Sequence, residues 1–511
     1  MLLSVLFLEP KDRLPDEQAT EPDFFVDLNL DQIVAAVTKG KEEYNLTPFF
    51  YMPLHDADAV LYRQETMHDL DNEPVKKVVT DFAEHMRRVR ELLAHTEEKL
   101  YHARQRERWF LDAAETYEDA VAQLTHDLPP KQIHSRGFKG LKKYLDTLVE
   151  SKQFKHLVEQ TKQIRKELDA ISYEVLIEGL RVEVRKYKNE PDYGTEIQHL
   201  FRRFSQESDH HYVYGFRDGT EMNHVEEKIL DLVADLFSDT FAKLTAFRSE
   251  HTHFQDATVV RFDREIQFYI AYQAYIEKLE TKKLRFCYPA TSSISKVVDA
   301  RESFDLALAA KLTERRDAPV TNDFALKGKE RIIVVSGPNQ GGKTTFARMF
   351  GQLHYLASLG LPVPGSSAHL YLPDRIYTHF EREEKMANLR GKLEDDLERM
   401  HVIFETATPH SLVLINEIFT STTLYDAISL SKKIADTIMD LDILCVWISF
   451  IDELSTLSDK TISMVSTVVP NRPAKRTFKI SRRPADGLAY AISIAEKHHL
   501  TYNRIKQRIE R

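Results

Sequence analysis

Residues 337–345 carry a glycine-rich loop, Gly-Pro-Asn-Gln-Gly-Gly-Lys-Thr-Thr, which matches the phosphate-binding pattern Gly-x-x-x-x-Gly-Lys-Ser/Thr. Glycines lack a Cβ, so successive main-chain N–H groups can face phosphates, and a following helix adds about half a positive charge. We expect Lys343 to reach the β- and γ-phosphates and the Thr344 hydroxyl to bind Mg²⁺. The loop therefore predicts nucleotide binding by nine residues: Gly337, Pro338, Asn339, Gln340, Gly341, Gly342, Lys343, Thr344 and Thr345.

A second candidate element is the apolar run 411–415, which ends in Asn416 and Glu417. In P-loop ATPases of the ABC class, an aspartate at the first position holds the metal shell, and a glutamate at the second polarises the attacking water. Glu417 is therefore the candidate catalytic base, and Asn416 joins Thr344 as a candidate metal ligand. Because an amide oxygen is neutral, we expect weaker Mg²⁺ binding than a carboxylate would give.

These residues need a rigid frame, and the pattern around them predicts a parallel sheet. Short apolar runs at 331–336, 411–415 and 443–448 alternate with helical segments such as 345–359. Continuous apolar strands of this kind are typical of a sheet buried on both faces. We expect an α/β domain over residues 325–511.

The preceding part of the chain has a helical pattern. Apolar residues at helical spacing over 75–124 predict one very long helix or two in tandem, and further helices are expected over 139–170, 223–250 and 263–282. Residues 172–178 and 180–188 interrupt this pattern and predict a β-hairpin. The apolar residues 1–8 are expected to form a buried strand, because no basic flank or cleavage site marks a signal peptide.

The second hairpin strand carries Arg181, Arg185, Lys186 and Lys188. One interpretation is a solvated edge strand protected from pairing by its charges. The other is a basic tip that touches phosphates. Sequence alone leaves both open.

The composition of the chain limits the classes of protein to which it can belong. The chain has 511 residues, a net charge of −10, 42% hydrophobic and 29% charged residues, and two cysteines. These values indicate folded domains, exclude a disulfide framework, favour a cytoplasmic location and leave no segment that could span a membrane. The histidines at 210–211, 251 and 253 are expected to be surface residues, because no third metal ligand follows them.

The loop and the acidic strand resemble those of the MutS-type DNA mismatch-repair ATPase family. The inserted Pro338-Asn339, the run Ser411–Ile418 and the segment 422–426 are similar to that family's motifs, and 286–289 resembles the junction between its lever and its ATPase domain. The resemblance implies an α-helical core and lever with a small β-hairpin clamp, followed by an ABC-class P-loop ATPase. The corresponding domains are 1–45 (N-terminal segment), 46–310 (core and lever, with a reduced clamp near 172–188) and 325–511 (ATPase).

The resemblance further implies ATP and Mg²⁺ as cofactors, a homodimer with two composite sites, and DNA bound by structure more than by sequence. Several positions depart from the family pattern. The amino-terminal mismatch-reading domain has no room, Asn416 replaces the metal-shell aspartate, and Leu393 stands where a serine would reach the partner's nucleotide. Phe450 stands where a histidine would follow the next strand, so it can transfer no proton. Binding is therefore better supported than turnover.

Two functions fit this pattern. The first is an ATP-dependent, MutS-like DNA-binding protein, which couples ATP binding, with or without slow hydrolysis, to dimer closure on DNA in mismatch repair or a related transaction. The second is a nucleotide-gated scaffold with little hydrolysis that acts on a protein or ribosomal partner. A small-molecule kinase is disfavoured, because the sequence offers no acceptor site.

Overall fold

The computed structural model describes residues 3–8, 20–98, 101–179, 181–188, 222–380, 391–469, 472–485, 502 and 505–506. The chain divides into two compact units. The helical unit comprises residues 71–133 and 139–263, and the sheet unit comprises residues 1–70, 134–138 and 264–511. The three-domain division expected from the sequence stays a prediction.

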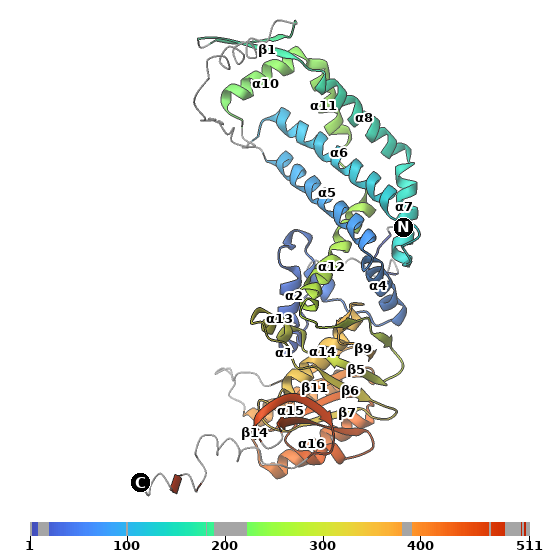
Figure 1. Ribbon diagram of the computed structural model, residues 1–511, viewed down its shortest axis with the longest axis vertical. Helices are drawn as coiled ribbons and strands as arrows, with labels where there is room; N and C mark the ends of the chain where they lie inside the picture. Colours follow the sequence, from blue (N-terminus) through green and yellow to red (C-terminus); the bar gives the residue numbers. More distant parts are fainter. Residues whose placement is uncertain are drawn as a thin grey trace, which may run out of the picture. The chain divides into compact units, whose positions relative to one another are not determined.

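The helical unit is built from long amphipathic helices. Its helices are α5 (Glu73–Glu97), α6 (Ala103–Asp127), α7 (Arg136–Val149), α8 (Lys152–Asp169), α10 (His224–Leu236), α11 (Ser238–Glu250) and the first part of α12 (Ala257–Glu280). The first three residues of α7, and α12 from residue 264 onward, belong to the sheet unit. Helices α5 and α6 pack side by side, as Figure 1 shows. Residues 75–124 thus form two tandem helices, the second of the two arrangements that the pattern allows.

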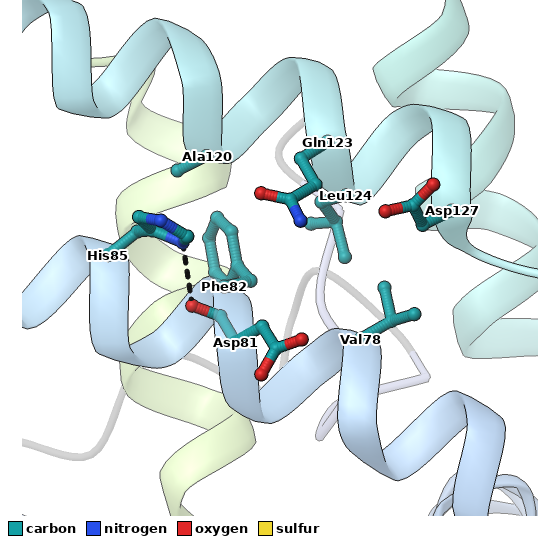
Figure 2. Close-up of a pocket in the computed structure, with 8 residues that line it drawn as sticks. All are labelled: Val78, Asp81, Phe82, His85, Ala120, Gln123, Leu124 and Asp127. Atoms are coloured by element: carbon teal, nitrogen blue, oxygen red, sulfur yellow. Dashed lines mark hydrogen bonds between the residues drawn. The ribbon is translucent and has the colours of Figure 1, made fainter.

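The core of the helical unit lies between α6, α8, α10 and α11. Phe110, Leu157 and Phe247 belong to one buried cluster there. Between α5 and α6, Phe82 and Leu124 line a pocket of about 10 Å³ (Figure 2). A cavity of that size holds about one water molecule, so it is no ligand site.

Strands β1 (Tyr173–Glu178) and β2 (Arg181–Lys186) form an antiparallel hairpin where the sequence predicts one. Gly179 makes the turn with a left-handed φ of 63°, which glycine adopts without strain.

Two helices differ from the predicted limits. The predicted helix 223–250 is broken at Phe237, whose φ of −118° and ψ of 39° end α10 and precede α11. Helix α12 begins at Ala257 instead of residue 263, because the Asp256 carboxylate accepts hydrogen bonds from the Thr258 and Val259 N–H groups.

A six-stranded sheet forms the centre of the sheet unit, in the order β10-β11-β12-β7-β13-β14. Its strands are β7 (Ile332–Ser336), β10 (Ile376–His379), β11 (Leu412–Asn416), β12 (Leu444–Ile448), β13 (Thr461–Val469) and β14 (Arg472–Arg482). All pairs are parallel except β13–β14. The parallel sheet expected from the sequence is therefore present, with one antiparallel edge.

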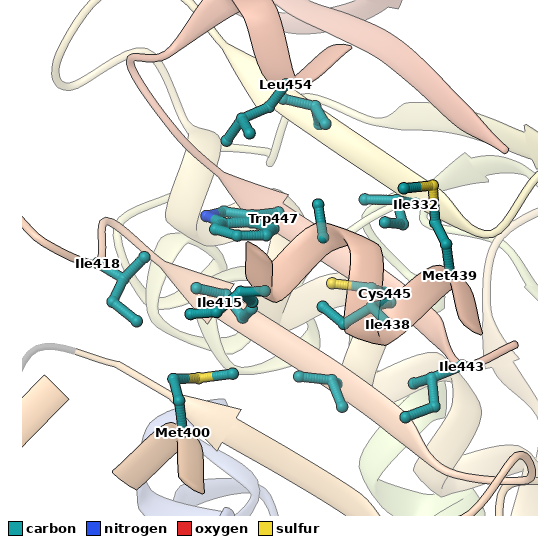
Figure 3. Close-up of a cluster of buried hydrophobic side chains, with 14 of the residues drawn as sticks. Ile332, Met400, Ile415, Ile418, Ile438, Met439, Ile443, Cys445, Trp447 and Leu454 are labelled. Atoms are coloured by element: carbon teal, nitrogen blue, oxygen red, sulfur yellow. The ribbon is translucent and has the colours of Figure 1, made fainter. Parts of the chain in front are cut away.

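Helices cover both faces of this sheet. Helix α14 (Lys343–Ser358) packs against β11 and β12, while α15 (Lys392–Thr406) and α16 (Leu424–Asp440) cover the other face. Figure 3 shows the second interface, where Trp447 and Cys445 from β12 meet Ile438 of α16. Burial on both faces explains why the central strands β7, β11 and β12 are apolar along most of their length.

A smaller sheet and several short elements complete this unit. The smaller sheet has the order β4-β9-β5-β6, and β3 pairs with β8. The strands are β3 (Phe286–Cys287), β4 (Ala290–Ser292), β5 (Val298–Ser303), β6 (Asn322–Leu326), β8 (Val363–Pro364) and β9 (Ser367–Tyr371). The helices are α1 (Phe25–Leu28), α2 (Leu30–Thr38), η1 (Glu42–Tyr44), α3 (Thr47–Phe50), α4 (Ala57–Leu70), α13 (Leu306–Glu314) and η2 (Asp452–Thr456). Among the described residues, no helix is both long and apolar enough to cross a membrane.

The N-terminal segment is buried, but the strand predicted there is wrong for its described residues, 3–8. Its main chain bonds to side chains instead of to a neighbouring strand. The buried Glu265 carboxylate accepts from the Ser4 hydroxyl at 2.8 Å and the Val5 N–H at 2.8 Å, and the Arg63 Nε donates to the Leu6 carbonyl at 2.9 Å. Apolar composition predicted the burial, whereas these distant polar partners decided the conformation.

Replacing Glu265 with alanine should lower the free energy of unfolding by about 2–5 kcal/mol, because buried donors at Ser4 and Val5 would lose their acceptor. Glu265→Gln should cost less, since an amide oxygen remains. Urea unfolding, with hydrogen exchange at residues 4–8, measures both changes. Glu280→Gln, at the exposed end of the same helix, is the control. Equal midpoints for Glu265→Ala and Glu280→Gln would contradict this role.

Candidate functional site

The predicted loop lies between β7 and α14, at the carboxyl end of the parallel sheet. Gly337 and Gly342 adopt left-handed φ values of 112° and 91°, and Gln340 has a φ of 59°. A Cβ on Gly337 would stand 2.9 Å from the Ser466 carbonyl oxygen of β13. Glycine is therefore required at residue 337 both by backbone conformation and by the close approach of the neighbouring strand.

Lys343 is the first residue of α14 and is only 4% exposed. Its Nζ donates to the Gly337 carbonyl at 3.1 Å and to Asn339 Oδ1 at 3.2 Å, and it lies 3.6 Å from Glu417 Oε1. The Phe450 ring centroid is 4.2 Å from the same ammonium. Burial lowers the pKa of Lys343, and the Glu417 carboxylate opposes that shift.

Thr344 and Asn416 meet directly. The Thr344 hydroxyl donates to Asn416 Oδ1 at 3.2 Å, although the two residues are 72 positions apart. Two neutral oxygens from α14 and β11 are thus side by side, as a shared metal site requires.

Glu417 follows Asn416 in a left-handed conformation, with a φ of 56°, and its N–H donates to the Ile448 carbonyl at 3.0 Å. A non-glycine residue in this region carries backbone strain, which is found at functional sites when surrounding contacts hold it. The turn directs the carboxylate to Lys343. The structure thus brings the candidate base, the candidate metal ligands and the loop lysine together.

The remaining loop residues differ in exposure. Pro338 and Gly341 are buried, Asn339 and Gln340 are exposed, and Thr345 is half-buried in the first turn of α14. Main-chain amides of the exposed part and the N-terminus of α14 could hold an anion.

The part of the chain that carries this site is similar to known proteins. Residues 333–507 match the family model of MutS domain V. This C-terminal part of the chain is MutS-like. It is 26% identical over 215 residues to the DNA mismatch repair protein MutS of Erythrobacter litoralis, covering 41% of this chain and 24% of that protein.

Two further relatives are also similar to part of this chain. Endonuclease MutS2 of Thermus thermophilus is 36% identical over 121 residues, covering 24% of this chain and 16% of the relative. MutS of Orientia tsutsugamushi is 26% identical over 217 residues, covering 41% and 24%. The chain thus spans about a quarter or less of the length of the MutS relatives it matches.

Three contacts within the MutS domain V region were not predicted from the sequence, and they come from the β13–β14 hairpin. The Ser466 hydroxyl donates to the Gly341 carbonyl at 2.7 Å, and Arg476 Nε donates to the Asn339 carbonyl at 3.2 Å. Phe478 is half-exposed beside Gly342. No local motif marks these residues, because their role depends on β13 pairing with β7.

The loop that follows β11 and carries Glu417 is held by a further contact that the sequence did not reveal. Asp396 of α15 accepts from the Phe419 N–H at 3.1 Å and lies 3.2 Å from His379 Nε2. Burial alone would raise the pKa of Asp396, but the nearby His379 ring and the hydrogen bond from the Phe419 N–H hold it below its usual value. The loop that carries Glu417 is therefore tied to α15.

Two of the positions that depart from the MutS pattern, Leu393 and Phe450, have structural roles. Leu393 is partly buried against the core beneath α15 and α16. Phe450 is 51% exposed and covers the Lys343 ammonium with its ring. Neither side chain offers a polar group to a phosphate.

Two of the four predicted basic residues of the hairpin lie opposite carboxylates. Arg185 pairs across the strands with Glu174, Arg181 pairs with Glu178, and the Arg185 Nε donates to Glu183 at 2.7 Å. Lys186 Nζ lies 5.2 Å from the Phe237 ring centroid. The hairpin is consequently less positive than its second strand alone predicts; Lys188 is exposed.

The histidines have different environments. His210 and His211 lie outside the described residues, and His253 is exposed. His251 is half-buried and lies near His156 and Glu250. His156 lies in α8, far from residues 250 and 251 in the sequence, so spacing along the chain could not reveal that the three groups meet.

Replacing Ser466 with alanine should destabilise the loop by about 1–3 kcal/mol, because the buried Gly341 carbonyl would lose its donor. Urea unfolding and nucleotide affinity should both report the loss. Ser463→Ala on the same strand is a matched control, since the Ser463 hydroxyl has no hydrogen-bond partner in the described part of the chain. If both variants bound nucleotide as the parent does, Ser466 would not support the loop.

Proposed function

We propose that this MutS-like chain binds ATP with Mg²⁺ at the loop 337–345 and couples binding and slow hydrolysis to closure of a homodimer on DNA. The observation that carries the proposal is the meeting of Lys343 and Thr344, at the start of α14, with Asn416 and Glu417, at the end of β11. An ABC-class P-loop arrangement, a cytoplasmic location and a role in mismatch repair or a related DNA transaction belong to the same proposal.

The loop and α14 would hold the phosphates. The main-chain N–H groups of the loop and the N-terminus of α14 supply partial positive charge, and no acidic residue lies in the first turn of that helix. Lys343 would exchange Glu417 and Asn339 for phosphate oxygens, which gives it stronger, charge-assisted hydrogen bonds.

Thr344 and Asn416 would hold Mg²⁺, whose charge would offset that of the phosphates. Both protein ligands are neutral oxygens, so we expect weaker binding than an aspartate at residue 416 would give.

Glu417 would act as general base for an attacking water. Its carboxylate is 27% exposed, so water can approach it. In the structure the Glu417 carboxylate is paired with Lys343, whose Nζ lies 3.6 Å from Oε1. Release of that pairing when phosphate binds Lys343 would link base activation to ligand binding.

The DNA part of the proposal rests on the names of the relatives, and the dimer part rests on the family resemblance of the loop and the acidic strand. Two of them are named DNA mismatch repair protein, and each is matched over about a quarter of its length. ATP would favour the closed dimer only if it binds that state more tightly than the open one.

A second function is favoured by Phe450 and Asn416. Phe450 covers Lys343 with an apolar ring, and Asn416 lacks the charge of a metal-shell carboxylate. A nucleotide-gated scaffold with little hydrolysis, acting on a protein or ribosomal partner, would need binding without turnover.

ATP binding and turnover, measured with and without mismatched, branched and perfect duplex DNA, test the proposal. Lys343→Ala should weaken ATP binding about 10–100-fold, because charge-assisted hydrogen bonds to phosphate are lost. Glu417→Gln should keep ATP binding and lower turnover about 10²–10⁴-fold, because the general base is removed.

The outcomes separate the two functions. Turnover that rises with DNA supports the first function. Tight binding without turnover, unchanged by DNA, supports the scaffold. Equal ATP binding by the parent and Lys343→Ala would overturn both, and normal turnover by Glu417→Gln would remove Glu417 from the base role.

The hairpin contribution to DNA binding is measured by salt dependence. Four glutamine replacements should flatten the plot of log affinity against log salt by about 0.9 for each DNA phosphate that the variant no longer neutralises. The replaced residues are Arg181, Arg185, Lys186 and Lys188. Glu183→Gln should have the opposite effect, because it removes the carboxylate that Arg185 contacts.

A charge-matched control keeps the hairpin intact. It replaces four exposed basic residues elsewhere in the helical unit: Arg87, Lys155, Lys228 and Lys243. If control and hairpin variants change the slope equally, the hairpin makes no particular contact with DNA.

A further inference from the structure

Three side chains that commonly bind transition metals meet where α11 ends beside α8. His156 lies in α8, Glu250 is the last residue of α11, and His251 follows it. One ligand atom from each lies within 4.8 Å of the other two. All three belong to the helical unit and are separate from the nucleotide site.

The spacing of these atoms is close to that of a zinc site. Zinc binds histidine nitrogen and carboxylate oxygen at about 2.0–2.2 Å, so neighbouring ligands of a tetrahedral ion stand about 3.3 Å apart. His156 Nε2 and Glu250 Oε1 are 3.4 Å apart already. The ligand atom of His251 lies within 4.8 Å of both, so His251 would have to move closer to complete three ligands.

Gln160 supplies a second layer of contacts. Its Oε1 is 2.5 Å from His251 Nε2, and its Nε2 is 3.4 Å from Glu250 Oε2. Groups of this kind orient metal ligands and raise affinity. His156 and Glu250 are each 53% exposed, so an ion can reach them from solvent.

We propose that His156, Glu250 and His251 bind a Zn²⁺ ion that joins α8 to α11, with a water molecule as fourth ligand. Two imidazoles and one carboxylate suit Zn²⁺ better than Mg²⁺ or Ca²⁺, which prefer oxygen ligands. The ion would sit beside the core cluster that contains Leu157 and Phe247, and would stabilise the helical unit by binding its folded state.

The test uses untagged full-length protein without nucleotide, so that neither a histidine tag nor ATP provides a second site. Calorimetric titration with ZnCl₂ should give one ion per chain, and titration with Co²⁺ should give the visible absorption of a four-coordinate ion. His156→Ala and His251→Ala should each weaken Zn²⁺ binding at least about tenfold, since loss of even an outer-layer partner costs about 10–100-fold.

Thermal unfolding provides a second measurement. Zn²⁺ should raise the melting temperature of the parent, and a chelator should reverse the rise. His224→Ala is the matched control, because His224 is fully exposed beside a single glutamate, Glu227, in the same unit. It should keep both the affinity and the temperature shift.

Either of two results would overturn the proposal. One is the absence of saturable Zn²⁺ binding by the parent. The other is unchanged Zn²⁺ affinity in His156→Ala and His251→Ala, with melting temperatures in chelator equal to that of the parent, which would mean that the ion binds elsewhere.

Discussion

The parallel pairing of β7 between β12 and β13 is the constraint on which the candidate site depends. The register aligns Asn416 with Ile448 and Ile448 with Val335, so the carboxyl ends of β11, β12 and β7 lie at one edge. Groups that are more than 70 residues apart in the chain thereby meet within hydrogen-bond distance. On the other side of β7, β13 brings Ser466 to the loop. One register thus positions both the reactive groups and their support.

The electrostatic balance at Lys343 follows from this arrangement. A buried ammonium needs compensation, and here two oxygen acceptors, the Glu417 carboxylate and the Phe450 ring provide it. A phosphate must therefore compete with existing partners for the lysine. The same exchange would free Glu417 from its contact with the lysine. In the proposed function, phosphate binding and release of the proposed base would therefore involve one ion pair.

Local sequence was sufficient wherever local rules decide the structure. The loop follows from glycine spacing, the strands of the parallel sheet follow from continuous apolar runs, and the helical character of residues 75–124 follows from a period of 3.6 residues, which left open whether they form one helix or two. Local sequence was insufficient where a distant side chain decides the conformation. Residues 3–8 form no strand, because Glu265 and Arg63 take their main-chain groups. Ser466 and His156 carry no signal of their own, since their partners lie 125 and 94 positions away.

The charge of the hairpin also could not be predicted from one strand alone. Along the second strand alone, the four basic residues form a positive edge. Across the pair, Glu174 faces Arg185 and Glu178 faces Arg181, so two of the four charges have carboxylates opposite them. Cross-strand neighbours are separated by about 5 Å, which is less than the Debye length of about 8 Å at physiological salt, so a phosphate would feel both signs. Any attraction of the hairpin for DNA must then come mainly from Lys186 and Lys188 at the end of the second strand, and Lys186 already lies over the Phe237 ring. The wider surface of the helical unit would have to supply the remaining phosphate contacts.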